Sequence, residues 1–290
     1  MLYLLCLLAQ PATDSVEAAD AAGGQFNAES RSELAASREA LLAVPSLQAN
    51  LRLRGHLNGR QFEAAGDYVA GSYPQTRLRL EIAIDTLTGT LLQVCDGQVS
   101  WTVREVTRQT TGPAAAGRAT SPTTQAPTDD VTRTTTIVRR DADRIVQAAG
   151  GATPQRRLLG DLGVGGLPAL LAGLERCFDF TPAAGSPEVI ELHGRWKPEV
   201  SAELGLNRDA TTLDLPTGVQ VTLDRSTTLP LRVLYVRGEA AAAVPMFSLE
   251  LQDLRTHVEL PSTIFEYAPP DDAPFEDLTR QTLAEMGVTP

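Results

Sequence analysis

The stretch Arg77-Leu78-Arg79-Leu80-Glu81-Ile82-Ala83-Ile84 alternates polar and apolar side chains almost throughout. Successive side chains on a β-strand point to opposite faces, so this pattern indicates a strand with one apolar and one polar face. The same two-residue period recurs between Asn58-Gly59 and Pro269-Pro270. It predicts one large antiparallel sheet that buries one face and leaves the other in water.

Two dipeptides mark tight hairpins within this region. Asn58-Gly59 and Asp96-Gly97 both supply residues that adopt positive φ, as two-residue hairpin turns require. Alternating segments flank them at residues 51–57, 60–69, 77–84, 91–95 and 99–103. We therefore expect five consecutive strands that form a meander.

Helical and extended patterns follow one another along the rest of the chain without a regular β-α-β alternation, which argues against a parallel sheet. A leucine stripe predicts an apolar helix over residues 166–176. Other helices are expected at residues 29–44, 141–149 and 277–286. Further strands are expected at residues 178–180, 188–196, 218–223, 231–237, 247–259 and 263–267.

Two segments differ from this pattern. Residues 107–136 are mostly Thr, Pro, Ala, Gly and Arg, and such a composition buries too little apolar area to offset the entropy of ordering. We expect a disordered insertion there. Residues 1–9 are apolar and resemble the end of a secretory signal, but are too short to span a membrane. The predicted organisation is a signal-like, flexible segment at 1–28 and one domain at 29–290.

Composition and motifs exclude several classes of function. The net charge is −11, and the basic residues are scattered, which disfavours nucleic-acid binding. No G-x-S-x-G string is present, and His56, His193 and His257 lie in separate strand patterns. The Gly-rich loop at 160–166 lacks the spacing of a nucleotide-binding motif and is interpreted as a hinge. We therefore predict no catalytic residue, no metal and no cofactor.

Cys95 and Cys177 are the cysteines that remain if the first segment is removed. In an exported chain such a pair is compatible with a disulfide, whereas two buried thiols are the usual alternative.

Several short strings, in this order and spacing, resemble the LolA-like family, specifically its divergent members similar to outer-membrane lipoprotein-sorting proteins. The strings are Asp96-Gly97-Gln98-Val99-Ser100-Trp101, Leu167-Pro168-Ala169-Leu170-Leu171 with Phe178-Asp179-Phe180, Gly194-Arg195-Trp196-Lys197-Pro198-Glu199, Leu229-Pro230-Leu231-Arg232-Val233-Leu234-Tyr235, and Phe265-Glu266-Tyr267-Ala268-Pro269-Pro270-Asp271 with Asp277-Leu278-Thr279.

The resemblance implies a curved, incomplete antiparallel β-barrel covered by a few helices, in an α+β, mainly β fold. It also implies an exported, periplasmic carrier of lipid or lipoprotein acyl chains. Strand parity adds the expected lining of its apolar cavity: Leu80, Ile82, Trp101, Val221, Tyr235 and Leu249, with Leu170 and Leu171 on the lid. The same fold serves as a sensor module in envelope-stress regulators, so a scaffold that docks a protein partner is the alternative. The insertion at 107–136 departs from the shorter carriers, and no strand arginine matches the one that latches their lid.

Overall fold

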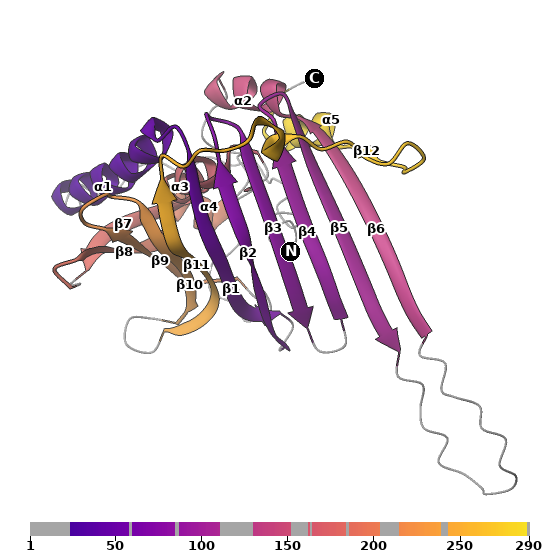
Figure 1. The fold of residues 1–290 in the computed structure, drawn as a ribbon. Helices are drawn as coiled ribbons and strands as arrows, with labels where there is room; N and C mark the ends of the chain where they lie inside the picture. Colours follow the sequence, from indigo (N-terminus) through magenta and orange to yellow (C-terminus); the bar gives the residue numbers. More distant parts are fainter. Residues whose placement is uncertain are drawn as a thin grey trace, which may run out of the picture.

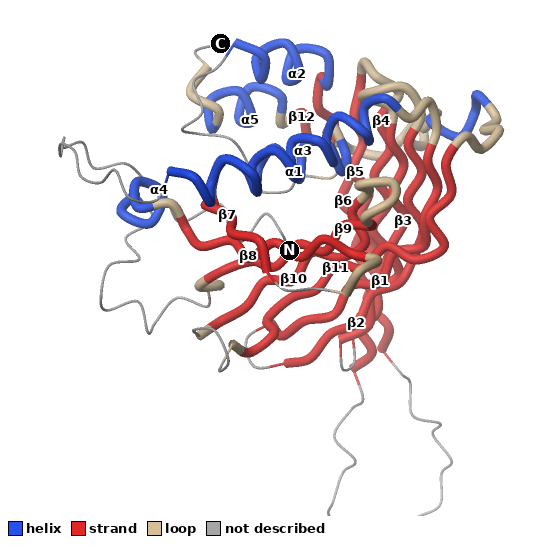
Figure 2. Tube along the Cα trace, turned by 90° about the vertical axis from the view of Figure 1, so that its left-hand side faces the viewer, coloured by secondary structure: helices blue, strands red, loops and turns tan. Residues whose placement is uncertain are grey.

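The computed structural model describes residues 24–57, 60–84, 87–110, 130–151, 162, 164–183, 186–203, 215–238 and 243–288. The signal-like residues 1–9, the Asn58-Gly59 turn, and Gly160, Asp161 and Gly163 of the Gly-rich loop lie outside these ranges. The described residues form one twelve-stranded sheet in the order β12-β6-β5-β4-β3-β2-β1-β11-β10-β9-β8-β7, which curves around the helices (Figures 1 and 2).

The first six strands are consecutive in the sheet, and each pairs antiparallel with the next. The Asp96-Gly97 turn is stabilised by Asp96 Oδ1, which accepts hydrogen bonds from the backbone N–H groups of Gln98 and Val99. Gly97 has a φ of 103°, as the hairpin signal required. These strands are β1 Leu47–Leu57, β2 Arg60–Ala70, β3 Thr76–Ile84, β4 Leu87–Cys95, β5 Val99–Thr110 and β6 Asp130–Asp141.

A second antiparallel series completes the sheet. Its last long strand, β11, pairs with β1, so the first and last long strands of the chain are neighbours. The short β12 runs parallel to the end of β6. The predicted fold class, a mainly β, curved and open sheet with a few helices, is confirmed. These strands are β7 Phe178–Ala183, β8 Val189–Trp196, β9 Gly218–Asp224, β10 Pro230–Arg237, β11 Val244–Thr256 and β12 Glu276–Asp277.

Two helices cover part of the curved sheet (Figure 2). Helix α1, Gly24–Ala43, packs against α3, Gly166–Cys177, and both contact β7. The leucines of α3 enter the main hydrophobic core together with inward residues of most strands. The remaining helices are α2 Ala142–Gly151, α4 Pro198–Glu203 and α5 Thr279–Glu285, with a 3₁₀ turn, η5, at Ser262–Phe265. No helix among the described residues has the length and apolarity of a membrane span.

Three sequence predictions need correction. Residues 107–110 and 130–136, expected to be disordered, belong to β5 and β6, because threonine is β-branched and favours strands. Residues 111–129 of that segment lie outside the described part. The strand expected at 263–267 is largely the 3₁₀ turn η5. Helix α1 begins at Gly24, inside the segment that was expected to be flexible.

Candidate functional site

The strand registers define two faces of the sheet. Leu80 on β3 lies opposite Gly66 on β2 and Leu91 on β4, and Leu91 lies opposite Arg104 on β5. Opposite residues of an antiparallel pair project to the same side. Because Leu80 is buried in the core that α3 shares, this row marks the face toward the helices, called here the concave face. The other face is the convex face.

Most of the predicted cavity residues lie in or beside the main core. Ile82 and Tyr235 are partly buried and pack against that core. The fully buried members are Leu80, Leu170, Leu171, Val221 and Leu249. Contact of these side chains with a ligand stays a prediction.

Trp101 was placed on the wrong face. Arg104 on the same strand projects to the concave face, and side chains alternate between the faces along a strand. Trp101, three residues before Arg104 and opposite Val94 and Arg139, therefore projects to the convex face. There its ring contacts Tyr267 and Phe275, with centroid separations of 5.8 and 5.3 Å. The C-terminal segment therefore contacts, on the convex face, a tryptophan that the sequence analysis assigned to the cavity.

The concave face has a side that is packed closed, called here the covered side. Leu171 and Leu174 on α3 are fully buried and belong to the same core cluster as Phe178, Phe180 and Val221. The pocket between α1, β2 and the start of α3 has a volume of about 20 Å³, which is room for about one water molecule. The interior below the helices is therefore a filled core at this point.

Tyr68 fixes the start of α3 over the sheet. Its buried hydroxyl oxygen accepts a hydrogen bond of 3.1 Å from the backbone N–H of Leu167, one of the N–H groups that the first turn of a helix leaves unpaired. Burial raises the pKa of Tyr68, so the hydroxyl stays protonated. Gly166 has a φ of 57°, and a Cβ there would lie 2.2 Å from the Tyr68 hydroxyl. Only glycine fits this approach.

An ion pair joins the other end of α3 to α1. Arg38 Nη1 lies 3.1 Å from Glu175 Oε2. Lys197 Nζ donates a 2.8 Å hydrogen bond to the carbonyl oxygen of Glu175. Burial raises the pKa of the Glu175 carboxyl, and the nearby Arg38 and Lys197 offset part of that rise. Helix α3 is thus held at both ends, to β2 by Tyr68 and to α1 by Arg38, which favours a fixed cover.

Beyond the helices, the concave face has an apolar row that is only half buried, called here the open side. It consists of Ile82, Ile84, Leu91, Tyr235 and Phe247, all partly buried and packed against the main core. On β3 the burial of the side chains decreases along the strand: Leu78 and Leu80 are buried, whereas Ile82 and Ile84 are only partly buried. The apolar surface therefore continues past the area that the core needs.

Aromatic rings line one part of the open side. Phe247 stacks on Phe62 with ring centroids 6.0 Å apart, and lies at the same separation from Tyr235 on the neighbouring strand. Gly55 makes the first contact feasible, because a Cβ at Gly55 would lie 2.8 Å from the Phe62 ring. Rings at such separations form attractive, fairly rigid pairs.

Two arginines border the apolar row on β5. Arg104 lies opposite Leu91, and Arg108 lies opposite Leu87, so both arise on the concave side. Both are exposed, and neither forms an ion pair with another residue in the described part of the chain. The open side thus combines an apolar strip with a positive margin, although the whole chain is acidic.

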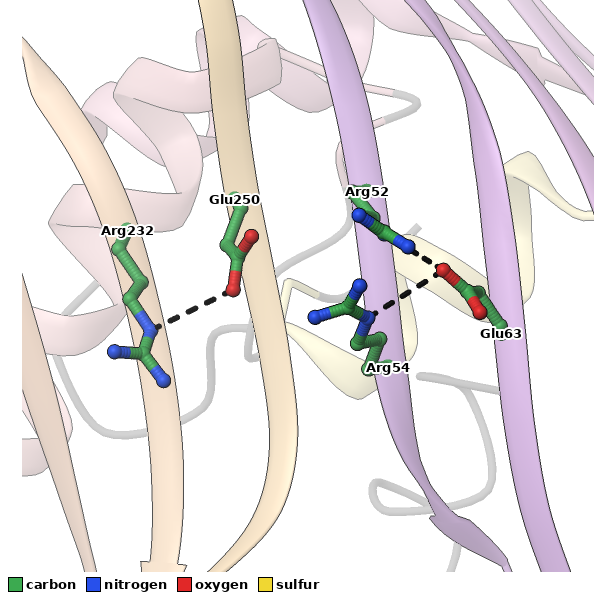
Figure 3. Close-up of polar contacts among 5 residues, drawn as sticks. All are labelled: Arg52, Arg54, Glu63, Arg232 and Glu250. Carbon is green, nitrogen blue, oxygen red and sulfur yellow. Dashed lines mark hydrogen bonds and ion pairs between the residues drawn. The ribbon is translucent and has the colours of Figure 1, made fainter.

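The convex face has a different electrostatic character (Figure 3). Glu63 on β2 lies 2.6 Å from Arg52 Nε and 3.4 Å from Arg54 Nε of β1, and Arg232 lies 3.9 Å from Glu250. The hydrogen bond from Arg52 lowers the pKa of Glu63. Such exposed pairs contribute little to stability. They make this part of the convex face a solvated surface of paired charges.

The described residues contain no cluster of three or more His, Cys, Asp and Glu side chains that could hold a metal ion. The histidines are exposed and lie apart, on β1, on β8 and after β11. Cys95 and Cys177 are both buried and are not joined to each other, so the disulfide that the sequence allowed is not formed. Burial raises the pKa of Cys95 to about 11, which makes its thiol unreactive.

Comparisons with known proteins give only distant matches. No protein-family model matches the chain, and no curated protein does. A crystal structure of MucB matches with a TM-score of 0.39 and 16% identity, over 83% of this chain and 63% of that one. The MucA/MucB complex of Pseudomonas aeruginosa matches with a TM-score of 0.39 and 14% identity, over 83% of this chain and 61% of that one. A DUF1329 family protein from Desulfovibrio piger matches with a TM-score of 0.30 and 10% identity, over 83% and 98%.

The chain spans about three fifths of the length of the MucB chains it matches.

Sequence reasoning missed several residues of the open side. Phe247 could have been found, because it lies two residues from Leu249 on one strand and so shares its face. Phe62 follows from the Asn58-Gly59 hairpin, which pairs it with Gly55. Parity also places Ile84 on the face of Ile82, but the partial exposure of Ile84 and Leu91 depends on where the helices end, which no local pattern gives.

Proposed function

We propose that this chain is an exported, non-catalytic binding protein that holds the acyl chains of a lipid or lipoprotein on the concave face. The observation that supports it is the half-buried apolar row of the open side, which the core and the helices leave partly uncovered. Burying a side chain of this size stabilises a complex by about 1.5–3 kcal/mol relative to leaving it in water. A flexible acyl chain is the ligand that covers such a strip without needing hydrogen bonds.

The margin of Arg104 and Arg108 suits an amphiphile with an anionic end. In this arrangement the acyl chain lies along Ile84 and Leu91, and the anionic group faces β5. Charged groups at such a border gain from electrostatic attraction while remaining hydrated. We propose the bacterial cell envelope as the location, because the apolar residues 1–9 resemble a signal and such a ligand is found there.

Mass spectrometry of the chain purified from its native envelope tests this function. We expect co-purified lipid on the wild type and much less on Phe247→Gln, because a polar amide replaces an apolar ring on the open side. Val244→Gln is the matched control, since Val244 begins the same strand and is 61% exposed. Lipid-free protein together with no uptake of a fluorescent fatty acid would count against the proposal.

The filled interior next to α3 favours a second function of a different class. A scaffold that docks a protein partner requires no cavity, and the pocket between α1, β2 and α3 has room for only about one water molecule. In this function the open side or a sheet edge binds the partner protein. The two functions separate in one experiment: a scaffold yields lipid-free protein whose fatty-acid uptake is absent, and Phe247→Gln leaves that result unchanged.

A further inference from the structure

The two edges of the sheet differ in how they are protected. The β7 edge has six residues, includes Pro182, and lies under α1 and α3. The β6 edge has twelve residues, and β12 pairs only with its Val138 and Arg139. Residues 131–136 are exposed, with Val131 at 53%. The β5–β6 register has no bulge, and residues 131–137 contain no Pro or Lys, the usual devices that block edge pairing.

One hydrogen bond shows which backbone N–H and C=O groups of β6 face outward from the sheet. The N–H of Leu278 donates to the carbonyl oxygen of Arg139 at 3.0 Å, so the backbone groups of Arg139 face away from β5. Outward groups alternate along a strand. The N–H and C=O groups of Val131, Arg133, Thr135 and Ile137 therefore also face outward. No strand in the described part of the chain pairs with them.

We propose that this edge pairs with the same edge of a second copy, antiparallel, with Thr134 on the two-fold axis. In this register Arg133 lies opposite Thr135 of the second copy, and their outward backbone groups meet. Thr132 then lies opposite Thr136, and Val131 lies opposite Ile137. Threonine pairs and apolar pairs across strands are favourable, and no like charges lie directly opposite each other.

The neighbouring registers are worse. An axis at Arg133 places the two copies of that arginine opposite each other, and like charges in this position are destabilising. An axis at Thr135 brings Thr132 opposite Val138, where β12 already pairs, so only residues 133–137 are left to pair, whereas an axis at Thr134 lets residues 131–137 pair before Asp130 reaches Val138. The axis at Thr134 uses residues 131–137, which end where β12 begins. The edge is therefore complementary to itself in one register, and this favours a second copy over an unrelated strand.

Local charge permits the contact although the chain carries a net charge of −11. The only charged side chain of residues 131–137 is Arg133, and it pairs with Glu105 of β5. Two short edges bury less area than the roughly 1,000 Å² of a stable interface. The dimer is therefore weak, forms with rising concentration, and strengthens with salt, which screens the net charge.

Cysteine crosslinking of the full chain tests the register. In a Cys6→Ser background, Thr134→Cys places two thiols across a non-hydrogen-bonded pair, a spacing that a disulfide can bridge. We expect it to crosslink at least about tenfold faster than Thr132→Cys, whose two copies lie roughly 14 Å apart in this register. Equal rates, or no crosslink at 134, would overturn the proposal.

Analytical ultracentrifugation of chains without an added cysteine gives an independent measurement of dimerisation. Wild-type chain should show concentration-dependent dimerisation, and Thr135→Lys should weaken it several-fold, because the new lysine lies opposite Arg133 of the second copy. In the monomer the same lysine lies opposite Glu105, so the melting temperature should not fall. A wild type that stays monomeric at high concentration, or a lysine variant that dimerises equally well, contradicts the proposal. Neither result bears on lipid binding by the concave face.

Discussion

The covered side and the open side of the concave face are built on the same strands but are packed differently. Leu80 on β3 is 3% exposed, whereas Ile84, four residues further along the strand, is only partly buried. On the covered side, leucines of α3 and inward strand residues pack together in one hydrophobic core. On the open side, apolar side chains that pack against the core remain only partly buried. We propose that the covered side supplies stability and the open side supplies binding.

The largest expected effect comes from removing a leucine of the lid. Leu171→Ala empties space at a fully buried position, so the free energy of unfolding should fall by about 3–5 kcal/mol. Ile84→Ala, on the open side, should cost about 1 kcal/mol because water already reaches that residue. Urea unfolding followed by circular dichroism measures both. Equal losses would show that the two sides do not differ in packing.

A smaller loss is expected at the anchor of α3. Gly166→Ala imposes a left-handed backbone on alanine and presses its Cβ onto the Tyr68 hydroxyl, which should cost about 2–4 kcal/mol. Gly97→Ala is the control, because φ is positive there too but the nearest atom to a Cβ is 3.8 Å away.

Tyr68→Phe isolates the contact itself. Alone it leaves the buried N–H of Leu167 without its acceptor, which should lower the free energy of unfolding by about 1–2 kcal/mol. Combined with Gly166→Ala it also removes the clashing oxygen. The double variant should therefore be more stable than the sum of the two single losses implies, and strict additivity in thermal unfolding would disprove the contact.

The smallest expected effect concerns the pH dependence of stability, to which two glutamates contribute with opposite sign. Burial raises the pKa of Glu175, so its contribution to stability is present below its ordinary pKa and is lost as pH rises through the folded value. The hydrogen bond from Arg52 lowers the pKa of Glu63, so the contribution of Glu63 is lost as pH falls. Unfolding midpoints across the acidic range should change slope in opposite directions for Glu175→Gln and Glu63→Gln. Slopes that change in the same direction would contradict the opposite pKa shifts of Glu175 and Glu63.

Sequence patterns predicted the strands well, because alternation and turn dipeptides are local properties. The same patterns could not say which face each strand buries. Val99, Trp101 and Val103 alternate as Leu78, Leu80 and Ile82 do, yet the first three lie on the convex face, where Tyr267 and Phe275 cover Trp101. That cover comes from a segment more than a hundred residues away. Composition likewise failed at residues 130–136, where pairing with β5 orders a threonine-rich strand.

The central claim is that the open side binds an acyl chain while the covered side does not. Titration of the folded chain with a fluorescent fatty acid tests it most directly, with Phe247→Gln on the open side and Arg52→Ala on the convex face as the matched pair. Loss of one aromatic contact should weaken binding by a factor of about ten to a hundred, whereas Arg52→Ala should bind as the wild type does. Equal affinities for all three chains, or no binding by the wild type, would contradict the claim.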